Sequence, residues 1–178
     1  MNKFALILIS SLIALPVHAE ARLTDVRLGI PCNSIPEIEK RLGSSELTTD
    51  DPGGIIKYSG IHGGEKATVI YHCSDNKLTE QTIIVTTTSR EQAYRFAQAQ
   101  KTELAGHLGD PIHDGLKLAL WKRLFFGFLG ADLDYLSAVV VWGRATEDVM
   151  ILIKETDVNL WQVFISQGSS KLEYILNS

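Results

Sequence analysis

The chain has 178 residues, and its 21 acidic side chains outnumber its 17 lysines and arginines, giving a formal net charge of −4 at pH 7. This mild acidity, without any run of basic residues, argues against nucleic acid and against an anionic membrane surface as the principal partner. The length fits one compact domain or two small units that share a core.

Residues 1–19 have the features of a secretory signal peptide. Lys3 supplies the positive charge near the start, residues 4–15 form an apolar run, and Ala19 is the small residue before the expected cleavage site. The apolar run is shorter than the roughly 20 residues that a membrane-spanning helix needs. We therefore expect cleavage after Ala19, no stable membrane insertion afterwards, and a periplasmic or secreted protein.

Residues 20–88 are predicted to form a first unit with one helix and a small antiparallel sheet. A Ser-x-x-Glu capping box at Ser34 predicts the start of a short helix, and Gly43 predicts its end. The strands expected after this helix are residues 55–59, 67–73 and 78–87, of which the last two form a hairpin.

Cys32 and Cys73 are the only cysteines in the chain. An even number of cysteines in an exported protein indicates a disulfide. The alternatives are a metal site or a cysteine nucleophile activated by the neighbouring His72. Adjacent side chains of a strand point to opposite faces, so His72 is not expected to activate Cys73. The sequence therefore favours a Cys32–Cys73 disulfide.

Residues 89–178 are predicted to form a second unit, which begins with the clearest helix of the chain, over residues 89–108. Ser89 and Gln92 form a capping box at its start, and Gly109 predicts its end. Residues at three- and four-residue steps give one mostly apolar stripe, which is expected to pack on the neighbouring strands. The stripe consists of Ala93, Phe96, Ala97, Gln100, Leu104 and Leu108.

The rest of the second unit is predicted to be a small sheet. The expected strands are a segment through residues 118–121, a buried strand at residues 139–142, and a hairpin of residues 149–154 and 159–166. The order of helix, Leu-Gly, strand and hairpin thus occurs twice along the chain. The predicted fold class is α+β, with two related units that each pack a helix on a small antiparallel sheet.

An apolar insertion near residues 124–136 has no counterpart in the first unit. A transmembrane interpretation fails, because each aspartate in the run would cost roughly 3 kcal/mol in a membrane. The aromatic residues either pack in the core or form a protruding patch for a protein partner. In the second case the patch consists of Phe125, Phe126 and Phe128 with Asp132 and Asp134 at its rim.

No catalytic motif, nucleotide-binding motif or established metal-ligand spacing is found in the sequence. The best polar cluster contains His107, Asp110, His113 and Asp114, and both residue types can bind zinc. Their spacing matches no known ligand pattern, so we interpret them as surface residues. The sequence therefore predicts a non-enzymatic protein with no catalytic residues, no metal and no cofactor.

The doubled order across residues 34–166, with Leu42-Gly43 and Leu108-Gly109 closing the two helices, resembles the secreted β-lactamase-inhibitor protein and its relatives. That family stacks two helix-plus-sheet repeats and binds an enzyme with a concave sheet surface. The resemblance is one of architecture. The second unit of this chain lacks a cysteine pair, and no binding residue of the family can be carried over.

The function expected from these observations is that of an exported, non-enzymatic protein-binding module. The resemblance implies an inhibitor or an immunity-type protector against an envelope-acting enzyme. The alternative is a periplasmic small-ligand-binding or envelope-assembly protein that uses a cavity between helix and sheet, and a hydrolase is the third choice.

Overall fold

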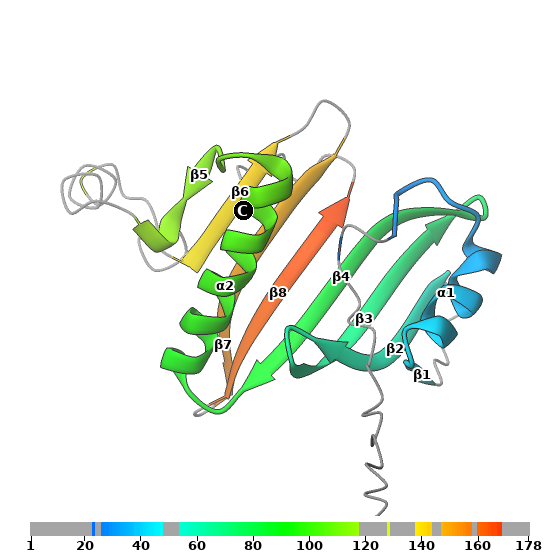
Figure 1. Ribbon diagram of the computed structural model, residues 1–178, viewed down its shortest axis with the longest axis horizontal. Helices are drawn as coiled ribbons and strands as arrows, with labels where there is room; N and C mark the ends of the chain where they lie inside the picture. Colours follow the sequence, from blue (N-terminus) through cyan, green and yellow to red (C-terminus); the bar gives the residue numbers. More distant parts are fainter. Residues whose placement is uncertain are drawn as a thin grey trace, which may run out of the picture.

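The computed structural model describes Leu23 and residues 26–47, 54–117, 128, 138–143, 147–157 and 160–168. These residues contain two α-helices, α1 (Ile35–Arg41) and α2 (Arg90–Leu108), and two short 3-10 helices, η2 (Cys32–Ser34) and η3 (Gly115–Lys117). Their strands are β1 (Ser45–Leu47), β2 (Ile55–His62), β3 (Glu65–Ser74), β4 (Lys77–Thr87), β5 (His113–Asp114), β6 (Val139–Gly143), β7 (Asp148–Asp157) and β8 (Leu160–Gly168). All of them belong to one antiparallel sheet in the order β1-β2-β3-β4-β8-β7-β6-β5 (Figure 1).

This single sheet contradicts the predicted fold class. We expected two units, each with a helix on its own small sheet, and that prediction is wrong. Strands β4 and β8 pair in antiparallel register from Glu80↔Gly168 to Thr87↔Trp161, so the strands of the two expected sheets form one sheet. The boundary predicted at residue 88 falls between β4 and α2, but the hydrogen-bonded sheet continues across it.

A second contact joins the two halves of the chain. The tip of the β2–β3 hairpin packs on α2, where His62 Nε2 donates a hydrogen bond of 2.8 Å to Gln100 Oε1. The His62 ring also meets the Phe96 ring edge-on, with 6.2 Å between ring centroids. A helix from the second half therefore covers a hairpin from the first half. This packing and the pairing of β4 with β8 together join the two predicted units into one.

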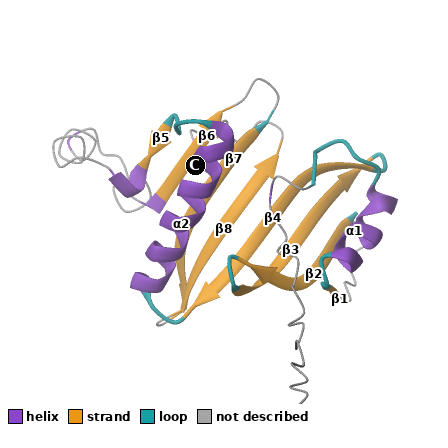
Figure 2. Cartoon of the chain, in the orientation of Figure 1, coloured by secondary structure: helices purple, strands orange, loops and turns teal. Residues whose placement is uncertain are grey.

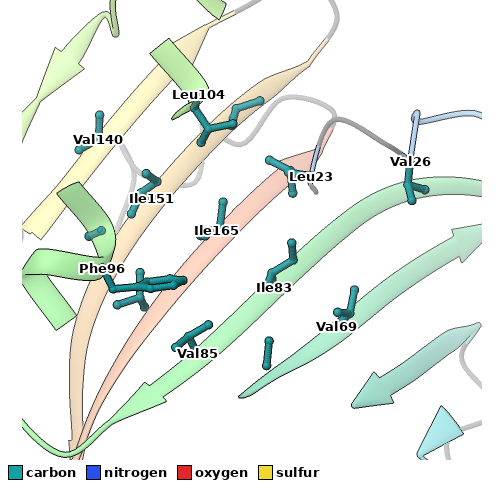
Figure 3. Packing of buried hydrophobic residues seen from close by; sticks show 14 of the residues in the cluster. Leu23, Val26, Val69, Ile83, Val85, Phe96, Leu104, Val140, Ile151 and Ile165 are labelled. Carbon is teal, nitrogen blue, oxygen red and sulfur yellow. The ribbon is translucent and has the colours of Figure 1, made fainter. Parts of the chain in front are cut away.

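Both α-helices lie on the same face of the sheet, which we call the covered face (Figure 2). The alternation of strand side chains places one apolar residue after another on this face, and together they form the main core. Burial of such side chains contributes about 1.5–3 kcal/mol each. The buried set includes Val69, Ile83, Val85, Val140, Ile151 and Ile165 from the sheet, with Phe96 and Leu104 from α2 (Figure 3).

Helix α2 has the ends that the sequence predicts. Ser89 adopts an extended conformation and its Oγ accepts a hydrogen bond of 3.2 Å from the backbone N–H of Gln92. Gly109 ends the helix with a φ of 81°. Its carbonyl accepts a hydrogen bond of 2.9 Å from Trp142 Nε1, which fixes this end of α2 to β6. The predicted stripe is buried from Ala93 to Leu104.

The predicted capping box at Ser34 is wrong, although the short helix exists. Ser34 has helical backbone angles because it belongs to η2, and its Oγ donates to the carbonyl of Pro31 at 2.6 Å. Helix α1 therefore begins at Ile35 without a side-chain cap.

Several predicted strands and turns are confirmed. The β3–β4 hairpin turns at Asp75 and Asn76, whose positive φ values of 50° and 57° suit a two-residue turn. Strand β6 is buried from Val139 to Trp142, and β7 and β8 form the expected hairpin. The predicted signal peptide and the predicted strand at residues 118–121 lie outside the described residues.

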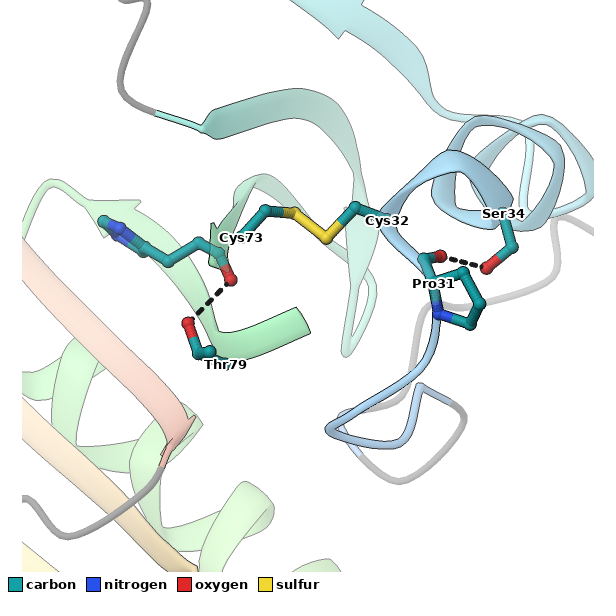
Figure 4. Close-up of a disulfide and its surroundings, with 6 residues drawn as sticks. Pro31, Cys32, Ser34, Cys73 and Thr79 are labelled. Atoms are coloured by element: carbon teal, nitrogen blue, oxygen red, sulfur yellow. Dashed lines mark hydrogen bonds between the residues drawn. A yellow bond between two sulfur atoms is a disulfide. The ribbon is translucent and has the colours of Figure 1, made fainter. Parts of the chain in front are cut away.

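The predicted disulfide is also confirmed: Cys32 and Cys73 are bonded (Figure 4). It fastens the segment before α1 to the end of β3. Backbone hydrogen bonds hold the same segment against β4, including one of 2.7 Å from the Gly29 N–H to the Leu78 carbonyl. Neither α1 nor α2 has the length and apolar character of a membrane-spanning helix, and the other described residues contain none.

Candidate functional site

A chain of buried polar side chains crosses the covered face. Gln167 Nε2 donates to the Val26 carbonyl at 2.7 Å and to Gln81 Oε1 at 2.9 Å, and Gln81 Nε2 donates to Tyr71 Oη at 3.4 Å. Tyr71 Oη in turn donates to a carboxylate oxygen of Glu39 in α1. Glu39, Tyr71 and Gln81 have no exposed surface. We therefore interpret this chain as structural, since a substrate has no access to it.

The electrostatics of this region favour neutral phenols. Burial raises the pKa of Tyr71 far above its usual value, and the negative charge of Glu39 and its hydrogen bond raise it further. Burial also raises the pKa of Tyr58, with smaller contributions from Glu46 and Glu39. The two rings meet edge-on with 6.2 Å between centroids. Both tyrosines therefore stay protonated and serve as packed core side chains.

The polar cluster around the end of α2 is not assembled as a metal site. Within the described residues, no three His, Cys, Asp or Glu side chains come together in a way that could hold an ion. Asp114 instead forms an ion pair with Lys101 of α2, with 3.0 Å between Nζ and Oδ2. His113 lies in β5 opposite Val141.

The aromatic patch proposed from the sequence lies largely outside the described residues. This is true of Phe125, Phe126, Asp132 and Asp134. Phe128 is described and is 89% exposed. The docking role of this patch stays a prediction.

A cavity of about 450 Å³ lies between the C-terminal turn of α2, the segment around Val26 and strands β7 and β8. Leu104 and Val149 are among its apolar lining residues, and Arg27, His107 and Glu147 are among its polar ones. The volume suits a small molecule. The two charged residues have opposite signs, so the cavity has no clear preference for the charge of a ligand.

The face of the sheet opposite the helices is the most extended candidate surface. We call it the open face, and within it we consider β2, β3, β4, β8 and β7. Neither α1 nor α2 packs on this face. Its apolar side chains are partly exposed rather than buried. They are Ile55, Ile61, Ile70, Ile84, Met150, Leu152 and Phe164.

Strand register places the apolar centre of the open face in one row. Thr68 pairs with Ile84, Ile84 with Phe164, and Phe164 with Leu152. Five neighbouring strands at about 4.8 Å spacing give this surface a width of about 19 Å. Apolar side chains that gather on an exposed surface commonly mark an interaction site.

The open face ends at β6. Val139 and Val141 point to the same side as Leu152 and Met150, with which they pair, but they are only 1% and 4% exposed. The accessible part of this face is therefore formed by β2, β3, β4, β8 and part of β7.

Sequence reasoning missed this surface. Ile83 and Val85 alternate with Thr82, Ile84 and Thr86 in a strand inside the sheet, and the second set is partly or fully exposed. Two lysines that face the same side of the sheet, Lys57 and Lys154, are the signal that the sequence offers. A strand face that is buried in a core seldom carries lysine.

Comparison of the chain with protein-family models, with curated proteins and with solved structures gave no match.

Proposed function

We propose that this protein is an exported, non-enzymatic binding module that docks a protein partner on its open face. One observation carries the proposal: both described helices pack on one face, and the opposite face presents a partly exposed row centred on Ile84 and Phe164. A buried aromatic anchor surrounded by polar residues is the usual layout of a protein interface. Phe164 is the aromatic residue in the centre of this row.

Export is the second part of the proposal. The signal-like residues 1–19 support it, and so does the Cys32–Cys73 disulfide, since such bonds persist in oxidising compartments. A small disulfide-bonded module in the periplasm or medium suits the role of an inhibitor or immunity-type protector against an enzyme that acts on the envelope. The partner then supplies the chemistry, and this chain supplies the surface.

The test uses tagged protein purified from bacterial periplasm and compares partner recovery between variants by quantitative mass spectrometry. Replacing Ile84 and Phe164 together by threonine removes the apolar centre and keeps residues that favour strands. Ile112→Thr is the control, because Ile112 is 63% exposed and lies outside the open face. Phe128→Ser tests the rival aromatic patch. Because the Phe128 side chain is exposed, this change should cost little stability.

We expect the wild type and Ile112→Thr to recover one protein in stoichiometric amount. The double variant should lose this protein while it still unfolds in one cooperative transition, with a midpoint lowered by only several degrees. If Phe128→Ser loses the partner protein and the double variant keeps it, the docking site is the aromatic patch and the open-face assignment is wrong. Failure of the wild type to recover any stoichiometric protein would overturn the binding function.

A second candidate function is the binding of a small ligand in the cavity beside α2. The volume of about 450 Å³ and the mixed polar and apolar lining favour it. Native mass spectrometry of protein purified from periplasm tests it directly. A bound small molecule in the wild type, lost when Val149→Trp fills the cavity, would support this function. An unmodified mass in both proteins would contradict it.

A further inference from the structure

The exposed charges of the open face are mostly basic, although the chain as a whole is acidic. Lys66 and Lys154 are exposed, and Lys57 is partly exposed. Among the side chains that the structure describes on this face, the acidic ones are Glu80, which is partly exposed, and Asp148, which is only 7% exposed. The full chain carries a net charge of −4. The described part of this face thus has a charge opposite to that of the molecule.

The lysines lie on both sides of the apolar row. Lys154 lies in the neighbouring row on one side, opposite Gln162. Lys66, the second residue of β3, lies at the same end of the sheet, opposite Ile61. Because β4 and β8 separate β3 from β7, these two lysines are about 14 Å apart. Lys57 lies on the other side of the row, opposite Ile70. The apolar row is therefore bordered by positive charge.

We infer that the partner presents an acidic protein surface with an apolar centre to the open face. The inference rests on the proposed function and adds the chemical class of the partner. Complementary charge around an apolar contact accelerates association and selects the partner, while the apolar centre supplies most of the affinity. The acidic remainder of this chain repels an acidic partner, so the attraction is confined to the open face.

Two features favour an acidic protein over a nucleic acid. The described residues of the open face include three lysines and no arginine, fewer cations than the six to ten phosphate contacts that give strong nucleic-acid binding. Phosphate groups also offer nothing that matches the row of Ile84, Phe164 and Leu152. A protein surface with acidic side chains around a protruding apolar residue matches both the lysines and the apolar row of the open face.

The experiment uses a defined probe, because the natural partner is not identified. A fluorescent peptide with a central Leu-Phe pair and three glutamates on each side is titrated against the purified protein at 20 mM salt. A peptide with lysines in place of the glutamates, a single-stranded oligonucleotide of 20 nucleotides, and vesicles with phosphatidylglycerol are titrated in parallel. Amide chemical shifts locate the bound acidic peptide on the protein.

We expect the acidic peptide to bind at least tenfold more tightly than the lysine peptide and to shift amides of β2, β3, β4 and β8. Lys66→Glu together with Lys154→Glu should weaken binding at least tenfold. The control pair Lys40→Glu and Lys117→Glu changes the net charge equally outside the open face, and it should weaken binding less than threefold. Raising the salt to 0.5 M should abolish the preference for the acidic peptide.

Equal binding of both peptides, or equal effects of the two charge-reversal pairs, would overturn the inference. Tighter binding of the oligonucleotide or the vesicles at the same amides would overturn it in favour of that other class of partner. Capture of the partner from periplasm distinguishes a failure of the acidic-partner inference from a failure of the proposed docking function. If Ile84→Thr with Phe164→Thr loses the partner but the lysine reversal keeps it, the docking site stands and the acidic class is wrong.

Discussion

The two faces of the sheet are made by the same strands, yet one is buried beneath helices and the other meets solvent. Ile83 and Ile84 are neighbours in β4, but Ile83 is fully buried beneath the helices while Ile84 is partly exposed on the open face. On the covered face apolar side chains fill the space between sheet and helix. On the open face a comparable row of apolar side chains meets solvent, beside lysines.

This difference teaches that composition alone does not tell which face of a sheet is the core. The covered face is defined by what packs on it: α2, α1 and the segment held by the disulfide. Its polar residues, such as Gln81 and Gln167, are hydrogen-bonded to each other. We expect substitutions on this face to act mainly on stability, and substitutions on the open face to act mainly on binding.

The largest expected effect comes from removing the disulfide that holds the first segment on the covered face. Cys32 and Cys73 are 41 residues apart in the chain. Closing a loop of that length contributes about 4 kcal/mol in the chain-entropy treatment. Replacing both cysteines by serine should lower the free energy of unfolding by about that amount in urea titrations. His72→Ala, on the open face next to Cys73, should cost less than about 1 kcal/mol. Equal losses in the two variants would contradict the comparison.

The most direct comparison of the faces uses the adjacent isoleucines of β4. Ile83→Ala leaves a cavity in the core and should cost about 2–5 kcal/mol. Ile84→Ala removes a partly exposed side chain and should cost about 1 kcal/mol. Urea unfolding of both variants measures the two values. A loss for Ile84→Ala as large as that for Ile83→Ala would mean that the open face is a buried face.

The contact between the β2–β3 hairpin and α2 can be tested at two adjacent glycines. Both have positive φ, 57° at Gly63 and 78° at Gly64. A Cβ on Gly63 would lie 2.7 Å from Phe96 Cε2, whereas a Cβ on Gly64 meets nothing within 4 Å. Gly64→Ala should cost about 1 kcal/mol through backbone strain, and Gly63→Ala about 2 kcal/mol more through the clash. Thermal melts of the two variants check the difference, and equal costs would argue against the packing on α2.

The smallest effect concerns alkaline pH. The covered face raises the pKa of Tyr58 and Tyr71, so the native state keeps these protons while the unfolded chain releases them above pH of about 10. Their contribution to stability is complete below that pH and is lost as the pH rises, by about 1.4 kcal/mol per pH unit for Tyr71. Melts between pH 8 and 11.5 measure this slope, and Tyr71→Phe should reduce it. A thermal stability that does not change between pH 8 and pH 11 would contradict the prediction.

Much of the local structure could be predicted because its signals lie within a few residues. The N-cap at Ser89, the glycine at 109, the hairpin of residues 67–73 and 78–87 and the parity of the cysteines each specify a local feature. Each is confirmed by the structure. The failure at Ser34 has a local cause too, since a 3-10 turn competes for the same residue.

The single sheet and the candidate surface could not be predicted in the same way. The pairing of β4 with β8 and the bond between His62 and Gln100 join distant residues, and neither has a local signature. The alternation in β4 shows that two faces exist, but the placement of α2 decides which of them is covered. That placement depends on tertiary packing, so the open face became visible only with the arrangement of helices and strands.

The pairing of β4 with β8 has a consequence for the order in which the chain folds. Gln81 and Gln167, which meet across this pair, are 86 residues apart, so the centre of the sheet has high contact order and is expected to form late. Until β8 arrives, β4 is an unprotected edge with the β-prone run Thr-Ile-Ile-Val-Thr, a typical site of aggregation. In the export that we propose, the N-terminal part of the chain leaves the translocation channel first, and this edge stays exposed until the last strand has crossed. Rapid synthesis should therefore lower the yield of soluble protein, and a C-terminal truncation before β8 should abolish it.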